Sequence, residues 1–209
     1  DDRSVLASHL INQPVDMALL AGTASDDANW LFIVNSDGSA SILNTLRSQD
    51  INGFTRWSTS GQIKSVNVVD DELYMVVERS IDGSTKQFVE RWDFNYLLDC
   101  SVKKTRTGSD VTGLEHLNGE EVSVLVDTEN YVLDRRTVSS NKIVLDSSEE
   151  YSGNYEVGIL FTPTIKPMPL NTNIGSGQNQ MRLKKIVRIN VRVYESSCIH
   201  IDGIPVPIR

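Results

Sequence analysis

Alternating apolar and polar residues, interrupted by tight turns, are the feature that most constrains the fold of this chain. Side chains of a β-strand point to opposite faces in turn, so a half-buried strand carries an apolar residue at every second position. The stretch NWLFIVNS (29–36) follows this rule and places Trp30, Phe32 and Val34 on one face. The pattern recurs along most of the chain without a long amphipathic helix. The sequence therefore predicts an all-β protein.

Two Asp-Gly pairs lie between alternating runs, at Asp37-Gly38 and at Asp82-Gly83. A type I′ turn needs a positive φ at both central residues, and Asp-Gly is one of the pairs that tolerate this conformation best. Each pair therefore predicts a β-hairpin.

The expected strands group into modules. Roughly four strands per 45 residues is the spacing of a propeller blade or a similar meander. We expect residues 1–105 to form propeller-like antiparallel meander sheets. Their expected strands cover residues 15–22, 29–36, 40–47 and 53–59 in a first set, and 62–69, 71–79 and 86–94 in a second.

Two further parts follow. Residues 106–165 contain about five short apolar runs separated by turn residues, which favours a small β-barrel. Residues 166–209 begin with a proline-bearing loop, which breaks regular structure, and continue into a strand expected over 181–196. We expect this last part to pack on the first. The turns of the barrel module are Asn118-Gly119, Ser139-Ser140-Asn141 and Ser152-Gly153-Asn154.

Charge is divided unevenly along the chain. The formal net charge is −8, and residues 161–209 carry seven Lys or Arg against two acidic residues, so the first 160 residues sum to −13. An acidic surface repels nucleic-acid phosphates and argues against tight DNA binding, although weak repulsion suits a wall past which DNA slides. A solvated acidic face is the simpler interpretation of the same charge.

The expected strand MRLKKIVRINVRVYES (181–196) has one mainly apolar face and one basic face. Side chains two apart on a strand are about 6.6 to 7 Å apart, a spacing that can follow a phosphate backbone. The basic residues are therefore candidates for a phosphate contact or a subunit contact, and a solvated strand face needs neither. These residues are Arg182, Lys184, Arg188 and Arg192.

Residue sets typical of catalysis or metal binding do not occur. His9, His116 and His200 stand singly, and the adjacent acidic residues, such as Asp70-Asp71, lie at expected turns. The segment NIGSGQNQ lacks the Lys-Ser or Lys-Thr of a P-loop. We expect no catalytic residue, no metal and no cofactor.

Two distant thiols, Cys100 and Cys198, make neither a disulfide framework nor a CxxC motif. We expect both to be reduced and unreactive. No run approaches the roughly 18 apolar residues of a membrane span, so we expect no membrane contact. The chain begins Asp1-Asp2 without Met, which favours a processed product or a fragment.

One segment carries a family resemblance. The stretch from Ile51 to Phe94 contains, in order, a W-x-T-x-G group, an LY-x-VV-x-R strand and a Glu-Arg pair. This order resembles the tail nozzle proteins of short-tailed bacteriophages, also called stabilisation or tail tubular proteins. Later segments, GLEHLNGEEVSVLVD, NKIVLD, YEVGILFTPTIKPMPL and RLKKIVRINVRVYES, are similar to further blocks of that family, and together the blocks span about residues 12–200. The first block comprises Trp57, Thr59, Gly61, Leu73, Tyr74, Val76, Val77, Arg79, Glu90 and Arg91.

The resemblance implies a non-enzymatic structural protein of the virion. It implies a propeller-like part with a small barrel, assembled as a homo-hexameric ring below the portal and adaptor. Such a ring encloses the DNA exit channel and carries tail fibres in some members. It also implies assembly in the host cytoplasm and a full-length protein longer than this chain.

The sequence leaves two alternatives open. A carbohydrate-binding or receptor-binding β domain could use Trp30, Trp57 or Trp92 as a stacking platform, although aromatic residues at alternating strand positions are more often core. A glycosidase could assemble its two carboxylates from different strands, because the fold and not the sequence spacing sets their separation.

Overall fold

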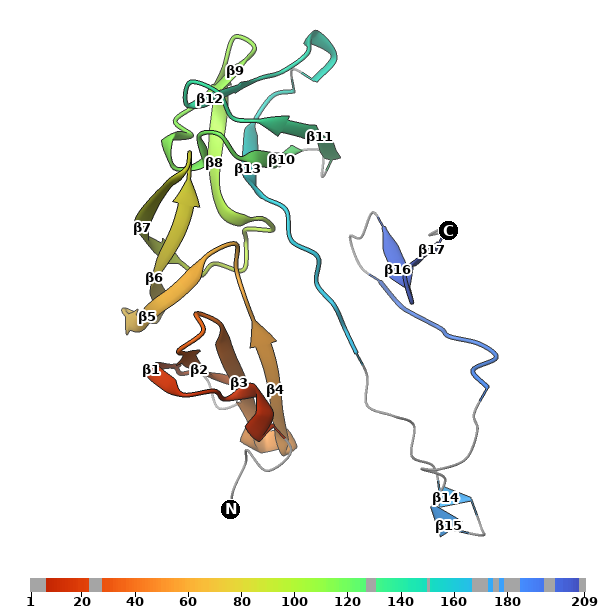
Figure 1. The fold of residues 1–209 in the computed structure, drawn as a ribbon. Helices are drawn as coiled ribbons and strands as arrows, with labels where there is room; N and C mark the ends of the chain where they lie inside the picture. The colour runs from red at the N-terminus through yellow and green to blue at the C-terminus, as the bar shows by residue number, and fades with distance from the viewer. Residues whose placement is uncertain are drawn as a thin grey trace. The chain divides into compact units, whose positions relative to one another are not determined.

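The computed structural model describes residues 7–22, 28–126, 131–149, 151–166, 173–174, 177–178, 185–193 and 198–206. The strands of these residues form five antiparallel sheets, joined by turns and four short 3₁₀-helices (Figure 1). The prediction of an all-β protein is confirmed. The chain divides into two units, Asp1–Pro163 and Thr164–Arg209, which are described separately.

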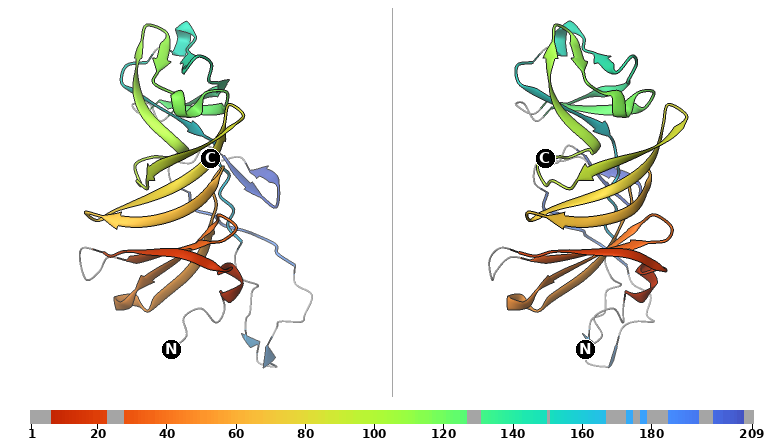
Figure 2. Two further views of the ribbon diagram at one scale, coloured as in Figure 1. Left: turned by 60° about the vertical axis from the view of Figure 1, so that its left-hand side comes forward. Right: turned by 90° about the vertical axis from the view of Figure 1, so that its left-hand side faces the viewer.

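Two meander sheets open the first unit, and in each the strands pair in chain order (Figure 2). This confirms the propeller-like antiparallel meanders expected from the alternating runs. The first sheet has four strands and the second has three. Their bounds are β1 Pro14–Leu20, β2 Asn29–Asn35, β3 Ala40–Leu46 and β4 Ile51–Trp57, then β5 Gln62–Val69, β6 Glu72–Ile81 and β7 Ser84–Arg91.

The expected hairpins form, but by different turns. Asp82 and Gly83 have φ of 53° and 69°, so the β6–β7 turn is the predicted type I′ turn. In the β2–β3 connection only Gly38 has a positive φ, of 81°, and the loop is longer. There the Asp37 carboxylate accepts hydrogen bonds from the backbone N–H and the hydroxyl of Ser39, at 2.9 and 2.6 Å, and so closes the turn.

A third tight turn joins β5 to β6 at Asp70-Asp71. Val69 pairs with Glu72, and the two aspartates between them have φ of 50° and 60°. Aspartate is tolerated in this left-handed region but is less favourable there than glycine. The Asp70-Asp71 turn therefore retains backbone strain.

The two meander sheets pack face to face around one apolar core. The burial of β6 alternates strictly from Leu73 to Arg79, as the sequence pattern predicts. Apolar side chains from both sheets are removed from water together, which is the main favourable term in folding. The buried members are Phe32, Val34, Ala40 and Ile42 from the first sheet, and Ile63, Val66, Leu73, Met75 and Val77 from the second.

A six-stranded sheet completes the first unit. Its order is β11-β10-β13-β8-β9-β12, and it curls into a small, open barrel around its own apolar core, as expected. The expected module boundary at residue 105 falls within β8. The strands are β8 Asp99–Thr107, β9 Asp110–Thr112, β10 Glu121–Val126, β11 Tyr131–Thr137, β12 Lys142–Val144 and β13 Asn154–Ile159.

The second unit contains two small hairpins, β14 (Asn173–Ile174) with β15 (Gly177–Gln178) and β16 (Ile199–Ile201) with β17 (Ile204–Val206). The strand predicted over 181–196 is wrong for its described part, because residues 185–193 form no strand. Alternation alone does not make a strand, since its backbone groups need a partner edge.

The strained β5–β6 turn gives the first prediction. Asp71→Gly should raise the free energy of unfolding by about 0.5 kcal/mol or more, because glycine adopts a positive φ without a Cβ clash. Asp71→Ala should lower it, because alanine is strained there and cannot bond locally. Urea unfolding followed by circular dichroism measures both, and equal stability of the two variants would contradict the prediction.

Candidate functional site

Arg79 is the centre of the most extensive polar cluster in the described residues. Its side chain is only 1% exposed, and all five of its N–H donors are used. Nε and Nη2 donate to the Glu90 carboxylate at 2.6 and 2.7 Å. Nη2 and Nη1 donate to the Asp99 carboxylate at 2.9 and 3.1 Å, and Nη1 also donates to the Ser60 carbonyl at 2.9 Å. We call Arg79, Glu90 and Asp99 the Arg79 network.

Burial and pairing act in opposite directions on this network. Burial alone would lower the pKa of Arg79, but the hydrogen bonds to Glu90 and Asp99 outweigh it and raise the pKa above its ordinary value. Burial likewise would raise the pKa of Asp99, yet the hydrogen bonds from Arg79 and Thr59 lower it overall. Arg79 and Asp99 are therefore both charged at neutral pH.

Four residues of the first family-like block, Thr59, Gly61, Arg79 and Glu90, meet at the Arg79 network. The Thr59 hydroxyl donates to Asp99 at 2.6 Å, and the Ser60 N–H donates to the same carboxylate at 3.2 Å. A Cβ on Gly61 would lie 2.6 Å from the carbonyl oxygen of Glu78 and 2.9 Å from Cγ of Arg79. Glycine is thus required for the close approach of this loop to β6. The block specifies a packed structural junction.

Cys100 and His116 lie beside the network. Burial, followed by the neighbouring carboxylates of Glu90 and Asp99, raises the pKa of the Cys100 thiol to about 12 despite the opposing charge of Arg79. Burial also lowers the pKa of His116, against a hydrogen bond with the Cys100 backbone. A neutral thiol and a neutral imidazole are suited to packing, whereas a nucleophilic cysteine needs a low pKa.

The three tryptophans named as a possible platform gather in one aromatic cluster with Phe32 and Phe94. Phe32 and Trp92 have ring centroids 4.7 Å apart, and Trp92 lies 5.8 Å from both Trp30 and Trp57. All three indoles are half-buried against the core of the meander sheets. The most exposed ring of the cluster is Phe94, at 67%, and no sequence pattern distinguishes it from the other rings.

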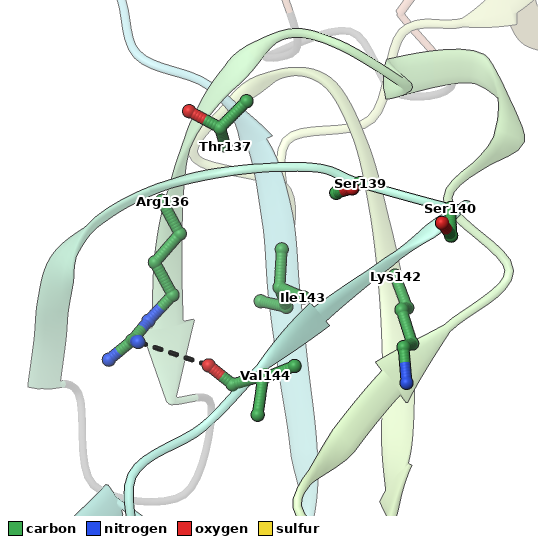
Figure 3. Close-up of a pocket in the computed structure, with 7 residues that line it drawn as sticks. All are labelled: Arg136, Thr137, Ser139, Ser140, Lys142, Ile143 and Val144. Atoms are coloured by element: carbon green, nitrogen blue, oxygen red, sulfur yellow. Dashed lines mark hydrogen bonds between the residues drawn. The ribbon is translucent and has the colours of Figure 1, made fainter.

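An open cavity of about 450 Å³ lies in the small barrel and is lined by basic, polar and apolar residues (Figure 3). Its two cations are already paired, since Arg136 bonds to the Val144 carbonyl at 3.0 Å and contacts Glu149, and Lys142 lies 2.6 Å from Asp110. The cavity therefore offers little free positive charge for an anion. Its lining residues are Arg136, Thr137, Ser139, Ser140, Lys142, Ile143 and Val144.

The four basic candidates are only partly within the described residues. Arg188 and Arg192 lie in the exposed segment 185–193, whereas Arg182 and Lys184 lie outside the described residues. The predicted phosphate or subunit contact stays a prediction.

The three histidines lie on separate elements. His9 and His116 lie on two different 3₁₀-helices and His200 lies on β16. Within the described residues, no three His, Cys, Asp or Glu side chains are grouped so that they could hold a metal. The described part of the chain also holds no helix of the length and hydrophobicity that a membrane crossing requires.

The fold and the Arg79 network define a protein built of antiparallel sheets around a buried ionic junction. No protein-family model matches the chain, and no curated protein and no solved structure is detectably similar to it.

Breaking the buried Arg79 network should lower the free energy of unfolding much more than breaking an exposed ion pair. Arg79→Met leaves two largely buried carboxylates unpaired and should destabilise the protein by about 3 to 5 kcal/mol. The matched control is Arg91→Met, because Arg91 pairs with Glu72 and Asp93 on an exposed surface and should change stability little. Denaturant unfolding measures both, and similar losses would contradict a special role of the Arg79 network.

The same comparison has an expected pH dependence. Because the folded pKa of Asp99 is lowered from 3.8, its contribution is present above that pH and is lost as pH falls toward the folded pKa. The stability gap between the wild type and Arg79→Met should therefore narrow below about pH 4.

Cys100 should react slowly while the protein is folded. With a pKa of about 12, its thiolate fraction at pH 8 is on the order of a thousandfold below that of an ordinary thiol near 8.5. In a Cys198→Ser variant, alkylation by iodoacetamide should be correspondingly slow before urea is added and fast afterwards. Fast alkylation of the folded variant would contradict the buried, protonated thiol.

Proposed function

We propose that this chain is a non-catalytic structural subunit of a short-tailed phage tail. In this proposal it belongs to the nozzle, where copies form a hexameric ring around the DNA exit channel. The ring contacts the portal and adaptor above and the tail fibres at its side. The location is then the virion, after assembly in the host cytoplasm.

The observation that carries the proposal is the exposed segment 185–193. Its apolar side chains Ile186, Val187, Ile189 and Val191 are 52% to 87% exposed, and its cations Lys185, Arg188 and Arg192 are exposed as well. Contiguous exposed apolar residues on a protein mark an interaction site. A basic and apolar segment fits the acidic first 160 residues of a neighbouring copy, because opposite charges steer and align two surfaces.

The chemistry of the family-like block also supports the proposal. Thr59, Gly61, Arg79 and Glu90 are used to hold sheets together, which is what a structural subunit requires. A buried and fully paired cluster of this kind has no free group for substrate. The net charge of −13 over the first 160 residues supports a wall that DNA passes without adhering to it.

Assembly gives the central test. The full chain at about 50 mM salt, where charge attraction is screened least, should give an oligomer in native mass spectrometry and rings in negative-stain electron microscopy. Arg188→Glu with Arg192→Glu should shift the population to monomer. The control reverses the same number of charges elsewhere, by Arg56→Glu with Arg135→Glu on the exposed faces of β4 and β11, and should leave the oligomer intact.

Several results would count against the proposal. A monomer under all conditions would remove the ring. A ring that still forms after the charges of Arg188 and Arg192 are reversed would show that the segment 185–193 is not the subunit contact. Tight retention of duplex DNA at about 0.15 M salt would contradict a non-adhering channel wall. A gene that lies among metabolic genes, with no portal or capsid gene beside it, would contradict the virion assignment.

A further inference from the structure

A small cavity of about 260 Å³ opens where the two meander sheets meet the segment that follows β7. Leu20 from β1 and Leu73 from β6 contribute to its lining, together with polar residues from the β5–β6 turn and from residues 91–95. It therefore combines an apolar wall with a few polar groups, which is the usual composition of a small-molecule site. The polar and aromatic lining residues are Asp71, Glu72, Arg91, Trp92, Asp93, Phe94 and Asn95.

An exposed aromatic ring borders this cavity. Phe94 is 67% exposed, and its ring centroid lies 4.7 Å from that of Trp92 and 6.2 Å from that of Trp30. The half-buried indoles of Trp30 and Trp92 pack against the Phe94 ring. We call Trp92 and Phe94 the aromatic shelf.

The segment that carries Phe94 is held by hydrogen bonds on both sides of the ring. The Trp92 N–H donates to the Leu73 carbonyl at 2.9 Å, and the Asn95 N–H donates to the Asp93 carboxylate at 2.9 Å. Further along, the buried Glu156 carboxylate accepts from the N–H groups of Leu97 and Leu98 at 2.7 and 2.8 Å. A fixed exposed ring binds a ligand without a large loss of conformational entropy.

Planar polar side chains surround the shelf in a fixed arrangement. Arg91 bridges Glu72 and Asp93, at 2.8 Å in both cases, and the Asn95 amide also donates to Asp93. Asp71 is exposed in the adjacent turn, and its carboxylate makes no hydrogen bond or ion pair with the described residues. Carboxylates accept, and guanidinium and amide groups donate, so the rim can bond several hydroxyls at once.

The geometry points to a saccharide-binding site at the aromatic shelf. A pyranose ring has an apolar C–H face that stacks on Phe94, and hydroxyl edges that bond to Asp71, Arg91 and Asn95. Three carboxylates against one guanidinium make the rim net acidic, which disfavours uronates and other anionic sugars. The ligand class is a neutral or amino-sugar oligosaccharide. This site goes beyond the proposed structural function and does not depend on it.

The test titrates the full chain with neutral and N-acetylated hexose oligosaccharides and with matched uronate oligosaccharides. Tryptophan fluorescence and saturation-transfer NMR follow binding, because Trp92 lies in the shelf. At least one neutral or amino-sugar oligosaccharide should bind saturably below about 10 mM, and the matched uronate should bind more weakly. Saturable binding of none of them, or preference for the uronate, would overturn the site.

Three variants assign the binding to the shelf. Phe94→Ala should weaken it about tenfold, because the stacking surface is lost. Asp71→Gly should weaken it about threefold although it relaxes the turn, so that loss of binding cannot come from unfolding. Phe161→Ala is the matched control, since Phe161 is an exposed phenylalanine outside the cavity. Unchanged affinity in Phe94→Ala, or an equal loss in Phe161→Ala, would overturn the assignment.

Discussion

The buried guanidinium of Arg79 is the interaction on which the first unit depends. It joins β6 and β7 of the second meander to Asp99, the first residue of β8, and so connects two sheets with separate apolar cores. Burying a charge costs several kcal/mol unless it is paired and hydrogen-bonded. Because every donor of Arg79 has an acceptor, any other placement of β8 would leave charge unpaired, which fixes how the sheets join.

Local signals in the sequence were sufficient for much of this fold. The alternation of residues 62–69 matches β5, and the Asp82-Gly83 turn has the predicted backbone. The same logic overlooked Asp202-Gly203, which has a positive φ at both residues and closes the β16–β17 hairpin. It also overpredicted a strand at 185–193. Pairing is a non-local property, so a segment with the right alternation but no partner edge cannot be recognised from its own residues.

The candidate sites were less predictable than the fold. Arg79 occupies an inward position in the alternation of β6, in line with Leu73, Met75 and Val77, so a charge on an apolar face was the available signal for a buried network. Its partners come from β7 and β8, and no spacing rule links them. The exposure of the Phe94 ring could not be predicted in this way, because alternation does not say which rings of an aromatic cluster face solvent. Those facts follow only from three-dimensional packing.

The division between buried and exposed residues has a functional consequence. Four residues of the family-like block, Thr59, Gly61, Arg79 and Glu90, meet at the Arg79 network and so specify the scaffold. Any binding must then use exposed groups such as Phe94 at the aromatic shelf or Arg188 in the segment 185–193. Surface residues can change without loss of the buried junction, because distant sites contribute independently to stability. The same rigid scaffold can therefore carry different surface residues and bind different partners.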